Sequence, residues 1–91
     1  MLSKIPIQRD KLSAEEDRDK EILRAGIMAE LDAINLYGQM AALARKDNIR
    51  KVLLDIAREE KTHVGEFQAL LLRIDREQAE ELKAGEQDGA V

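Results

Sequence analysis

Apolar residues recur every three or four positions along two long stretches of the chain. In the first stretch this stripe runs through Leu23, Ile27, Glu30, Ile34, Tyr37 and Ala41. In the second stretch it runs through Leu53, Ile56, Glu60, His63, Phe67, Leu70 and Ile74. Alternating steps of three and four place residues on one face of a helix. The pattern therefore predicts two helices packed along a shared seam, and no segment shows the period of two that a β-strand requires.

Start and end signals place the first helix between residue 13 and about residue 45. Ser13 is the predicted N-cap, and Glu16 can reach back to it to complete a capping box. Gly26 and Gly38 fall inside this helix, where each weakens it by about 1 kcal/mol relative to alanine without ending it. Residues 1–12 hold the only proline and no helical period, so they are predicted to form an extended arm.

The connection between the helices is predicted at residues 46–48, with Asp47 as the N-cap of a second helix that ends near Ile74. Residues 76–83 predict a short third helix that ends at Gly85, followed by a flexible tail over residues 85–91. The fold class expected is all-α: a two-helix antiparallel hairpin over residues 13–84 with a short third helix.

Composition narrows the classes of function. Ninety-one residues make one small domain, and with 2% aromatic residues its core must be aliphatic. The net charge is −4 and no basic block is present, which argues against nucleic-acid binding. Without cysteine the chain has no disulfides and no thiolate metal ligands. No signal peptide or membrane-spanning run is visible, so we expect a soluble, cytoplasmic protein.

Three ionisable residues interrupt the middle of the two apolar stripes: Glu30 in the first, and Glu60 and His63 in the second. An unpaired carboxylate in a core costs several kcal/mol. A divalent cation removes that cost, because it neutralises carboxylates and binds a neutral imidazole. Residues three apart share a helix face, so Glu60 and His63 can bind one ion. Glu30 would approach from the antiparallel neighbour, with a mismatch of roughly 6 Å along the axis if the turn is at Asp47.

One chain supplies half of a known ligand set. Di-iron carboxylate bundles use a Glu from each of two helices and a Glu-x-x-His from each of the other two. Two copies of this chain would provide four helices and six ligands, so a homodimer is expected. Dimerisation would also cover apolar residues predicted to lie outside the seam: Met28, Leu36, Met40 and Leu43 on the first helix, and Leu54, Ala57, Val64 and Leu71 on the second.

Each of these residues also has an interpretation that involves no metal. His63 can be a core histidine hydrogen-bonded to Glu59 or Glu60, and a Glu-x-x-His pair arises by chance in glutamate-rich helices. Glu30 on the facing stripe shifts the balance towards a metal site. Tyr37, two turns after Glu30, is a packed aromatic residue or a redox-active one.

The same residues indicate which metal ions the site would suit and what a bound ion would do. Oxygen-rich ligation with one imidazole suits Fe(II), with Mn(II) or Zn(II) as substitutes. A bound ion can alternatively serve only to pin the dimer together. Asp32 and Glu66 are surface residues by default, with an acidic iron path as the minority interpretation.

Two segments carry a family resemblance: MAELDAINLYGQM at residues 28–40 and LLDIAREEKTHVGEFQALL at residues 53–71. They resemble the encapsulated ferritins, two-helix members of the ferritin-like superfamily, and the ferritin-like domain fused to some archaeal encapsulin shell proteins. The similarity covers about residues 7–84. The specific parts are the interval from Glu30 to Tyr37 and the Glu60-x-x-His63 motif.

The resemblance implies a di-iron ferroxidase centre between two chains, with dimers assembled into a decameric ring inside an encapsulin nanocompartment. Glu30, Glu60 and His63 match the iron ligands, and Tyr37 matches a tyrosine beside the centre. Ala29 and Asp32 occupy positions where some members have glutamates of an outer metal site, so Asp32 is only a possible secondary ligand. No shell-targeting peptide is evident after residue 85, which leaves a piece of a shell fusion or another route into a shell.

The function expected is therefore that of a ferroxidase, which oxidises Fe(II) with O₂ or peroxide and supplies iron for storage in the shell. Two alternatives remain. One is a rubrerythrin-like peroxide reductase, which normally needs a cysteine-containing electron-donor domain. The other is a metal-free helical assembly module.

Overall fold

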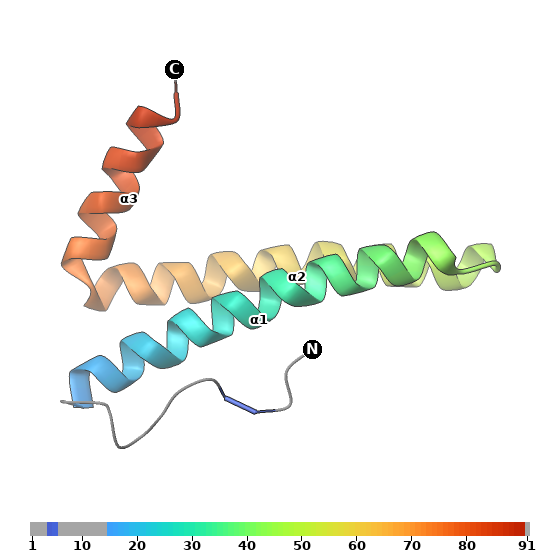
Figure 1. Cartoon of the computed structure of the whole chain (residues 1–91), viewed down its shortest axis with the longest axis horizontal. Helices are drawn as coiled ribbons and strands as arrows, with labels where there is room; N and C mark the ends of the chain where they lie inside the picture. The colour runs from blue at the N-terminus through green and yellow to red at the C-terminus, as the bar shows by residue number, and fades with distance from the viewer. Residues whose placement is uncertain (1–3, 6–14, 91) are drawn as a thin grey trace.

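The chain folds into three helices, as a computed structural model shows for residues 4–5 and 15–90, the side chain of Glu16 excepted. These are α1 (Glu15–Leu43), α2 (Asp47–Ile74) and α3 (Arg76–Asp88). α1 and α2 run antiparallel along each other, and α3 turns steeply away from the end of α2 (Figure 1). The described residues include no strand, so the all-α prediction is confirmed. The predicted capping box at residues 13–16 and most of the predicted arm lie outside the described residues.

The turn of the hairpin comes earlier than predicted, at residues 44–46. Asp47 is the first residue of α2 rather than its N-cap; Lys46 has that position and its side chain makes no capping hydrogen bond. This correction removes the axial mismatch expected for the polar residues. Glu30 lies 15 residues before Arg45, at the centre of the turn, and Glu60 lies 15 residues after it.

Arg50 closes this turn from the first part of α2. Its Nη2 donates to the carbonyl oxygen of Ala44 at 2.7 Å, and its Nε donates to that of Ala41 at 3.4 Å. The last carbonyls of a helix have no partner within it, so a guanidinium placed there supplies missing donors and opposes the negative end of the helix dipole. Arg50 therefore fixes the end of α1 against the start of α2.

The core of the hairpin is built largely from small residues. The buried apolar residues among those described are Ala33, Ala41, Ala57 and Leu71. Ala57 and Leu71 were predicted to lie outside the seam, and that prediction is wrong. Conversely Leu70 and Ile74, predicted in the seam, are 47% and 46% exposed. Alanines permit close approach of the two helices. Near the C-terminal end of α2, the side chain buried against α1 is that of Leu71, and Leu70 and Ile74 lie beside it on the exposed side.

Asp75 forms the elbow between α2 and α3. Its extended backbone (φ −123°, ψ 91°) ends α2, and its side-chain Oδ1 accepts a hydrogen bond from the backbone N–H of Gln78 at 3.0 Å. Its Oδ2 accepts from Nη2 of Arg24 on α1 at 2.5 Å. Only 7% of Asp75 is exposed. One carboxylate thus caps α3 and ties the elbow to the other arm of the hairpin.

The third helix is longer than predicted. It continues through Gly85 to Asp88, so the proposed end at Gly85 and the flexible tail from that residue are wrong for residues 85–88. Gly85 has no positive φ, and a glycine in a helix interior costs about 1 kcal/mol without supplying a stop. The helix ends instead at Gly89, whose N–H donates to the carbonyl oxygen of Gly85 at 2.8 Å.

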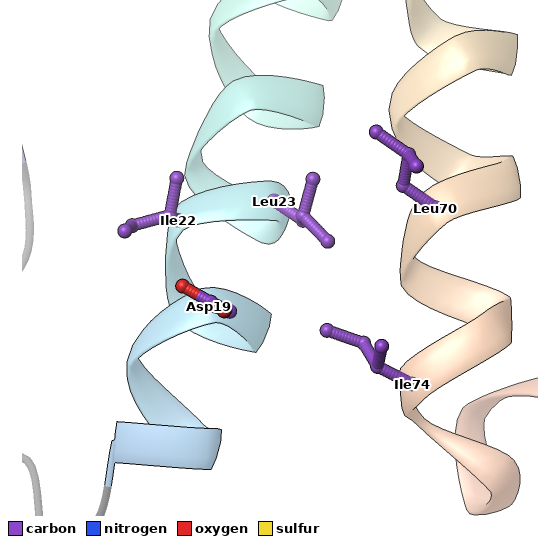
Figure 2. A pocket seen from close by; sticks show the side chains of 5 residues that line it. All are labelled: Asp19, Ile22, Leu23, Leu70 and Ile74. Carbon is purple, nitrogen blue, oxygen red and sulfur yellow. The ribbon is translucent and has the colours of Figure 1, made fainter.

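Much apolar surface remains uncovered on the single chain. The large apolar residues left 40–83% exposed on the three helices are Ile22, Met28, Leu31, Met40, Leu43, Ile49, Val52, Leu54, Leu70, Ile74 and Leu82. Towards the elbow, Leu23, Leu70 and Ile74 border a shallow apolar pocket together with Asp19 and Ile22 (Figure 2). None of the described helices has the length and apolar character needed to cross a bilayer. An apolar surface this extensive is characteristic of an interaction site.

Candidate metal centre

Glu30 of α1 meets Glu60 and His63 of α2 at the middle of the hairpin. Nδ1 of His63 lies 3.4 Å from Oε2 of Glu30 and 3.5 Å from Oε2 of Glu60. One ligand atom from each of the three residues can be chosen so that all lie within 4.8 Å of one another. The sequence spacing explains the arrangement: Glu60 and His63 share a helix face, and the turn centred on Arg45 brings Glu30 level with Glu60.

These side chains lie at the edge of the seam rather than deep in the core. The side chains of Glu30 and Glu60 are each 18% exposed, and that of His63 is 44% exposed. These side chains were expected to be enclosed between two copies of the chain, and in the single chain they remain partly exposed. A two-helix hairpin has no third or fourth helix to cover this face, so the cluster keeps one open side.

One oxygen of the cluster lacks a partner. Among the described residues, Oε2 of Glu30 is buried and accepts no hydrogen bond. The imidazole nitrogen at 3.4 Å is beyond the 2.7–3.2 Å typical of an N–H···O hydrogen bond. A buried acceptor left unsatisfied costs about 1–3 kcal/mol, and more when it is charged. An ordinary hydrogen-bonded histidine would not leave this oxygen unpaired, whereas a cation between the donors would satisfy it.

No arginine or lysine among the described residues neutralises the cluster. Arg58, two residues before Glu60, is paired with Asp55, and its guanidinium lowers the pKa of that carboxyl through a hydrogen bond and charge attraction. Arg24, six residues before Glu30, is paired with Asp75 and, at 4.0 Å, with Glu21. Two carboxylates and one imidazole therefore converge without an arginine or lysine partner among the described residues. Two oxygen donors and one nitrogen donor suit a divalent ion such as Fe(II), Mn(II) or Zn(II).

The remaining predicted site residues do not join this group. Tyr37 is half-buried on α1, two turns beyond Glu30. Asp32 is exposed on α1 and is not among the three residues whose donor atoms converge. Glu59 and Glu66 are exposed on α2. The roles of Tyr37 and Asp32 stay predictions.

Four residues with a structural part in the hairpin or its elbow were not recognised as such from the sequence. Asp75 and Gln78 carry an N-cap signal, an aspartate followed three residues later by glutamine, which could have located the start of α3. No sequence pattern indicated that Arg24 would reach Asp75, because the two are 51 positions apart. Gly26 was assessed only as a weakness in the helix, although it lies against Phe67.

An antiparallel helical hairpin with a Glu facing a Glu-x-x-His pair defines a ferritin-like protein. Comparison with known families agrees: the rubrerythrin family model matches residues 21–89. The chain belongs to the rubrerythrin family. Within it, the chain is similar to the encapsulated ferritins, and the crystal structure of the encapsulated ferritin domain from Pyrococcus furiosus matches it with a TM-score of 0.79. That match has 50% sequence identity and covers 93% of this chain and 91% of the other.

Two relatives with curated names extend the comparison. The Ferritin-like-encapsulin shell fusion protein of Pyrococcus furiosus is 62% identical over 79 residues, which cover 87% of this chain and 23% of that protein. The Encapsulin nanocompartment cargo protein EncC of Myxococcus xanthus is 38% identical over 61 residues, covering 67% of this chain and 47% of that protein. The chain thus spans about a quarter and about half of these relatives. The resemblance to encapsulated ferritins inferred from the sequence is confirmed.

Proposed function

We propose that this protein is a ferroxidase, which binds Fe(II) at Glu30, Glu60 and His63 and oxidises it to Fe(III). The observation that carries the proposal is the convergence of these three ligands from two helices, with Oε2 of Glu30 buried and without a partner. Membership of the rubrerythrin family supports an iron-related function. Mn(II) or Zn(II) would occupy the same donors as substitutes.

The open side of the cluster supports a site completed by a second copy of the chain. His63 is 44% exposed and apolar side chains nearby, including Met28 and Leu31, are half-exposed. A two-fold related copy would cover this face and contribute a second Glu30, Glu60 and His63. The four helices and six ligands then match the set used by di-iron bundles. Dimer formation would cover the exposed apolar side chains, and iron would compensate the charge of the carboxylates that the dimer brings together. Dimer formation and iron binding would therefore favour each other.

Each ligand has a distinct part in the proposed reaction. The glutamates would neutralise the charge of the bound ferrous ions, and His63 would supply a ring nitrogen as a ligand. Two Fe(II) give up one electron each, and one O₂ takes up both electrons with two protons to form hydrogen peroxide. Tyr37, half-buried two turns from Glu30, would tune or quench the oxidised state. Asp32 would be at most a secondary iron ligand.

The names of the relatives support a partner as well as a reaction. One is a fusion to an encapsulin shell, and the other is an encapsulin cargo protein. We extend the proposal accordingly: dimers assemble into a ring of five, and the ring acts inside a cytoplasmic encapsulin nanocompartment where Fe(III) is stored. An open ring would have no cavity of its own for a mineral, so storage would be the task of the shell.

The test is anaerobic loading with Fe(II), followed by mixing with O₂ and recording Fe(III) absorbance. We expect wild-type protein to oxidise about one iron per chain rapidly, and His63→Ala and Glu60→Ala to lose rapid oxidation by at least about 100-fold. Glu59→Ala is the matched control, because Glu59 is exposed on the same helix. Unchanged kinetics in the ligand variants would overturn the proposal, as would an equal loss in the control. Mixing with peroxide instead of O₂ distinguishes a peroxide reductase.

A further inference from the structure

The aromatic ring of Phe67 packs directly against the backbone of α1 at Gly26. A Cβ atom on Gly26 would lie 3.3 Å from Cε2 and 3.4 Å from Cδ2 and Cζ of that ring. Carbon atoms pack best about 3.5–4.0 Å apart, so a Cβ at residue 26 would press slightly against the ring. The other helical glycines differ: a Cβ on Gly38, Gly65 or Gly85 would meet nothing within 4 Å.

This contact is one helical turn from the metal centre. Gly26 precedes Glu30 by four residues, and Phe67 follows His63 by four residues. Because α1 and α2 are antiparallel, both steps run in the same direction along the hairpin and each covers about 6 Å. The pair Gly26 and Phe67 therefore lies on the same seam as the pair Glu30 and His63, directly adjacent to it along the helix axes.

The glycine at residue 26 is explained by its contact with Phe67 and not by an unusual backbone conformation. None of the described residues has a positive φ, so the conformation at residue 26 is open to any amino acid. Glycine is a poorer helix former than alanine, so a purely helical role would favour alanine at this position. Only the close approach of the Phe67 ring sets residue 26 apart from the other helical glycines. The distance between packed helix axes depends on the side chains at the contact.

We propose that Gly26 and Phe67 set the spacing between α1 and α2 that brings Glu30 within binding distance of Glu60 and His63. Gly26 is thus a positioning residue for the metal centre. An added methyl group forces a shift of a few tenths of an ångström, either in the ring or between the helices. Metal sites respond to displacements of that size, because ligand distances must be met to within about 0.2 Å. This inference deepens the proposed function and rests on it.

The test uses the full-length chain and Co(II), with binding measured by titration calorimetry and folding by circular dichroism. We expect Gly26→Ala to remain helical and to bind Co(II) about tenfold more weakly, the lower end of what outer-shell changes cause. Gly38→Ala and Gly85→Ala are matched controls with open space around the added methyl. They should melt a few degrees higher, as expected of a stronger helix former, and bind Co(II) as the wild type does.

A second pair of variants removes the ring. If the spacing arises from the Phe67 contact, Gly26→Ala in a Phe67→Leu background should bind Co(II) like Phe67→Leu alone. If Gly26→Ala binds Co(II) as tightly as the glycine controls, the inference is overturned. It is also overturned if Gly26→Ala weakens Co(II) binding by the same factor in the Phe67→Leu background. If wild-type protein itself takes up no Co(II), the proposed function fails instead. A metal-free crystal structure of Gly26→Ala then decides the spacing, since we expect the Glu30–His63 separation to exceed 3.4 Å.

Discussion

Two polar clusters connect the arms of this hairpin, and they differ in how far their charges are satisfied. At the elbow, both oxygens of Asp75 accept hydrogen bonds, one from the backbone of α3 and one from Arg24. At mid-hairpin, Glu30, Glu60 and His63 bring two carboxylates together without an arginine or lysine partner among the described residues, and Oε2 of Glu30 accepts no hydrogen bond.

The number of hydrogen bonds made by each cluster distinguishes a cluster that holds the fold together from one suited to bind a ligand. A buried polar group with every hydrogen bond made holds a fold in one arrangement. A convergent group with unpaired acceptors destabilises the chain until something binds. Burial alone would single out the elbow, because the side chain of Asp75 is 9% exposed and those of the candidate metal centre are at least 18% exposed. Satisfaction of the hydrogen-bonding groups is the better guide.

The largest expected effect is stabilisation by a metal bound at the mid-hairpin cluster, the one group of convergent ligands among the described residues. With Co(II) at about 100 times its dissociation constant, stability should rise by about 2.7 kcal/mol, which corresponds to roughly 10–20 °C for a domain of this size. His63→Ala should lose this shift in the melting temperature, and Asp75→Ala should retain it. Thermal unfolding by circular dichroism measures both. A metal-induced shift that survives in His63→Ala would place the ion elsewhere.

Next comes the loss of the elbow carboxylate. Asp75→Ala removes the N-cap of α3, which costs about 1 kcal/mol, and the hydrogen bond from Arg24, whose contribution is reduced because the arginine side chain is 42% exposed. We expect a loss of about 2 kcal/mol in urea unfolding. Asp75→Asn keeps a good capping residue and should lose about half as much. If both variants are as stable as the wild type, the elbow is no structural tie.

A smaller effect of opposite sign is expected when Glu30 loses its charge. Glu30→Gln relieves repulsion with Glu60, which is of the order of 1 kcal/mol for charges about 4 Å apart in a water-like medium. The metal-free variant should therefore be more stable than wild type by about 0.5–1 kcal/mol, yet show no stabilisation by Co(II). Urea unfolding with and without the ion tests both halves. If metal-free Glu30→Gln is less stable than the wild type, the cluster has a structural role like that of the elbow.

The smallest effect is expected at an exposed pair that is also satisfied. Arg58 lowers the pKa of Asp55, so any stabilisation is present above the pH at which an unfolded aspartate titrates, near 4. It is lost as the pH falls through the lower pKa of the folded state. Because both side chains are largely in water, Arg58→Ala should leave the melting temperature at pH 7 within measurement error. A clear decrease in the melting temperature would show that a paired charge stabilises the fold even when it is exposed.

Much of this structure was predictable from local pattern. The two stripes gave both long helices, and their polar interruptions gave Glu30, Glu60 and His63 as the candidate site. The misses have particular causes. Asp47 and Lys46 are both acceptable near a helix start, so the turn was placed two residues late, and Arg50, which fixes it, acts through tertiary contact. Gly85 resembled a stop signal but has an ordinary helical backbone.

The seam of α2 shows a different kind of limit. Periodicity places residues on a face but leaves its rotation towards the neighbour uncertain by about one residue, or about 100°. Ala57 and Leu71 fill the core, and Leu70 and Ile74 do not, because the small residues of α1 admit α2 at close range. The same closeness gives Gly26 its contact with Phe67, which no sequence pattern indicated.

The amino-acid sequence was enough to predict the helical class and the three candidate ligands, because helix periodicity and the chemistry of each side chain can be read locally. The packing of the helices set the level at which α1 meets α2, the hydrogen bond between Arg24 and Asp75, and the open side of the candidate metal centre. These depend on contacts between residues far apart in the chain, whose geometry is settled only when the two helices pack.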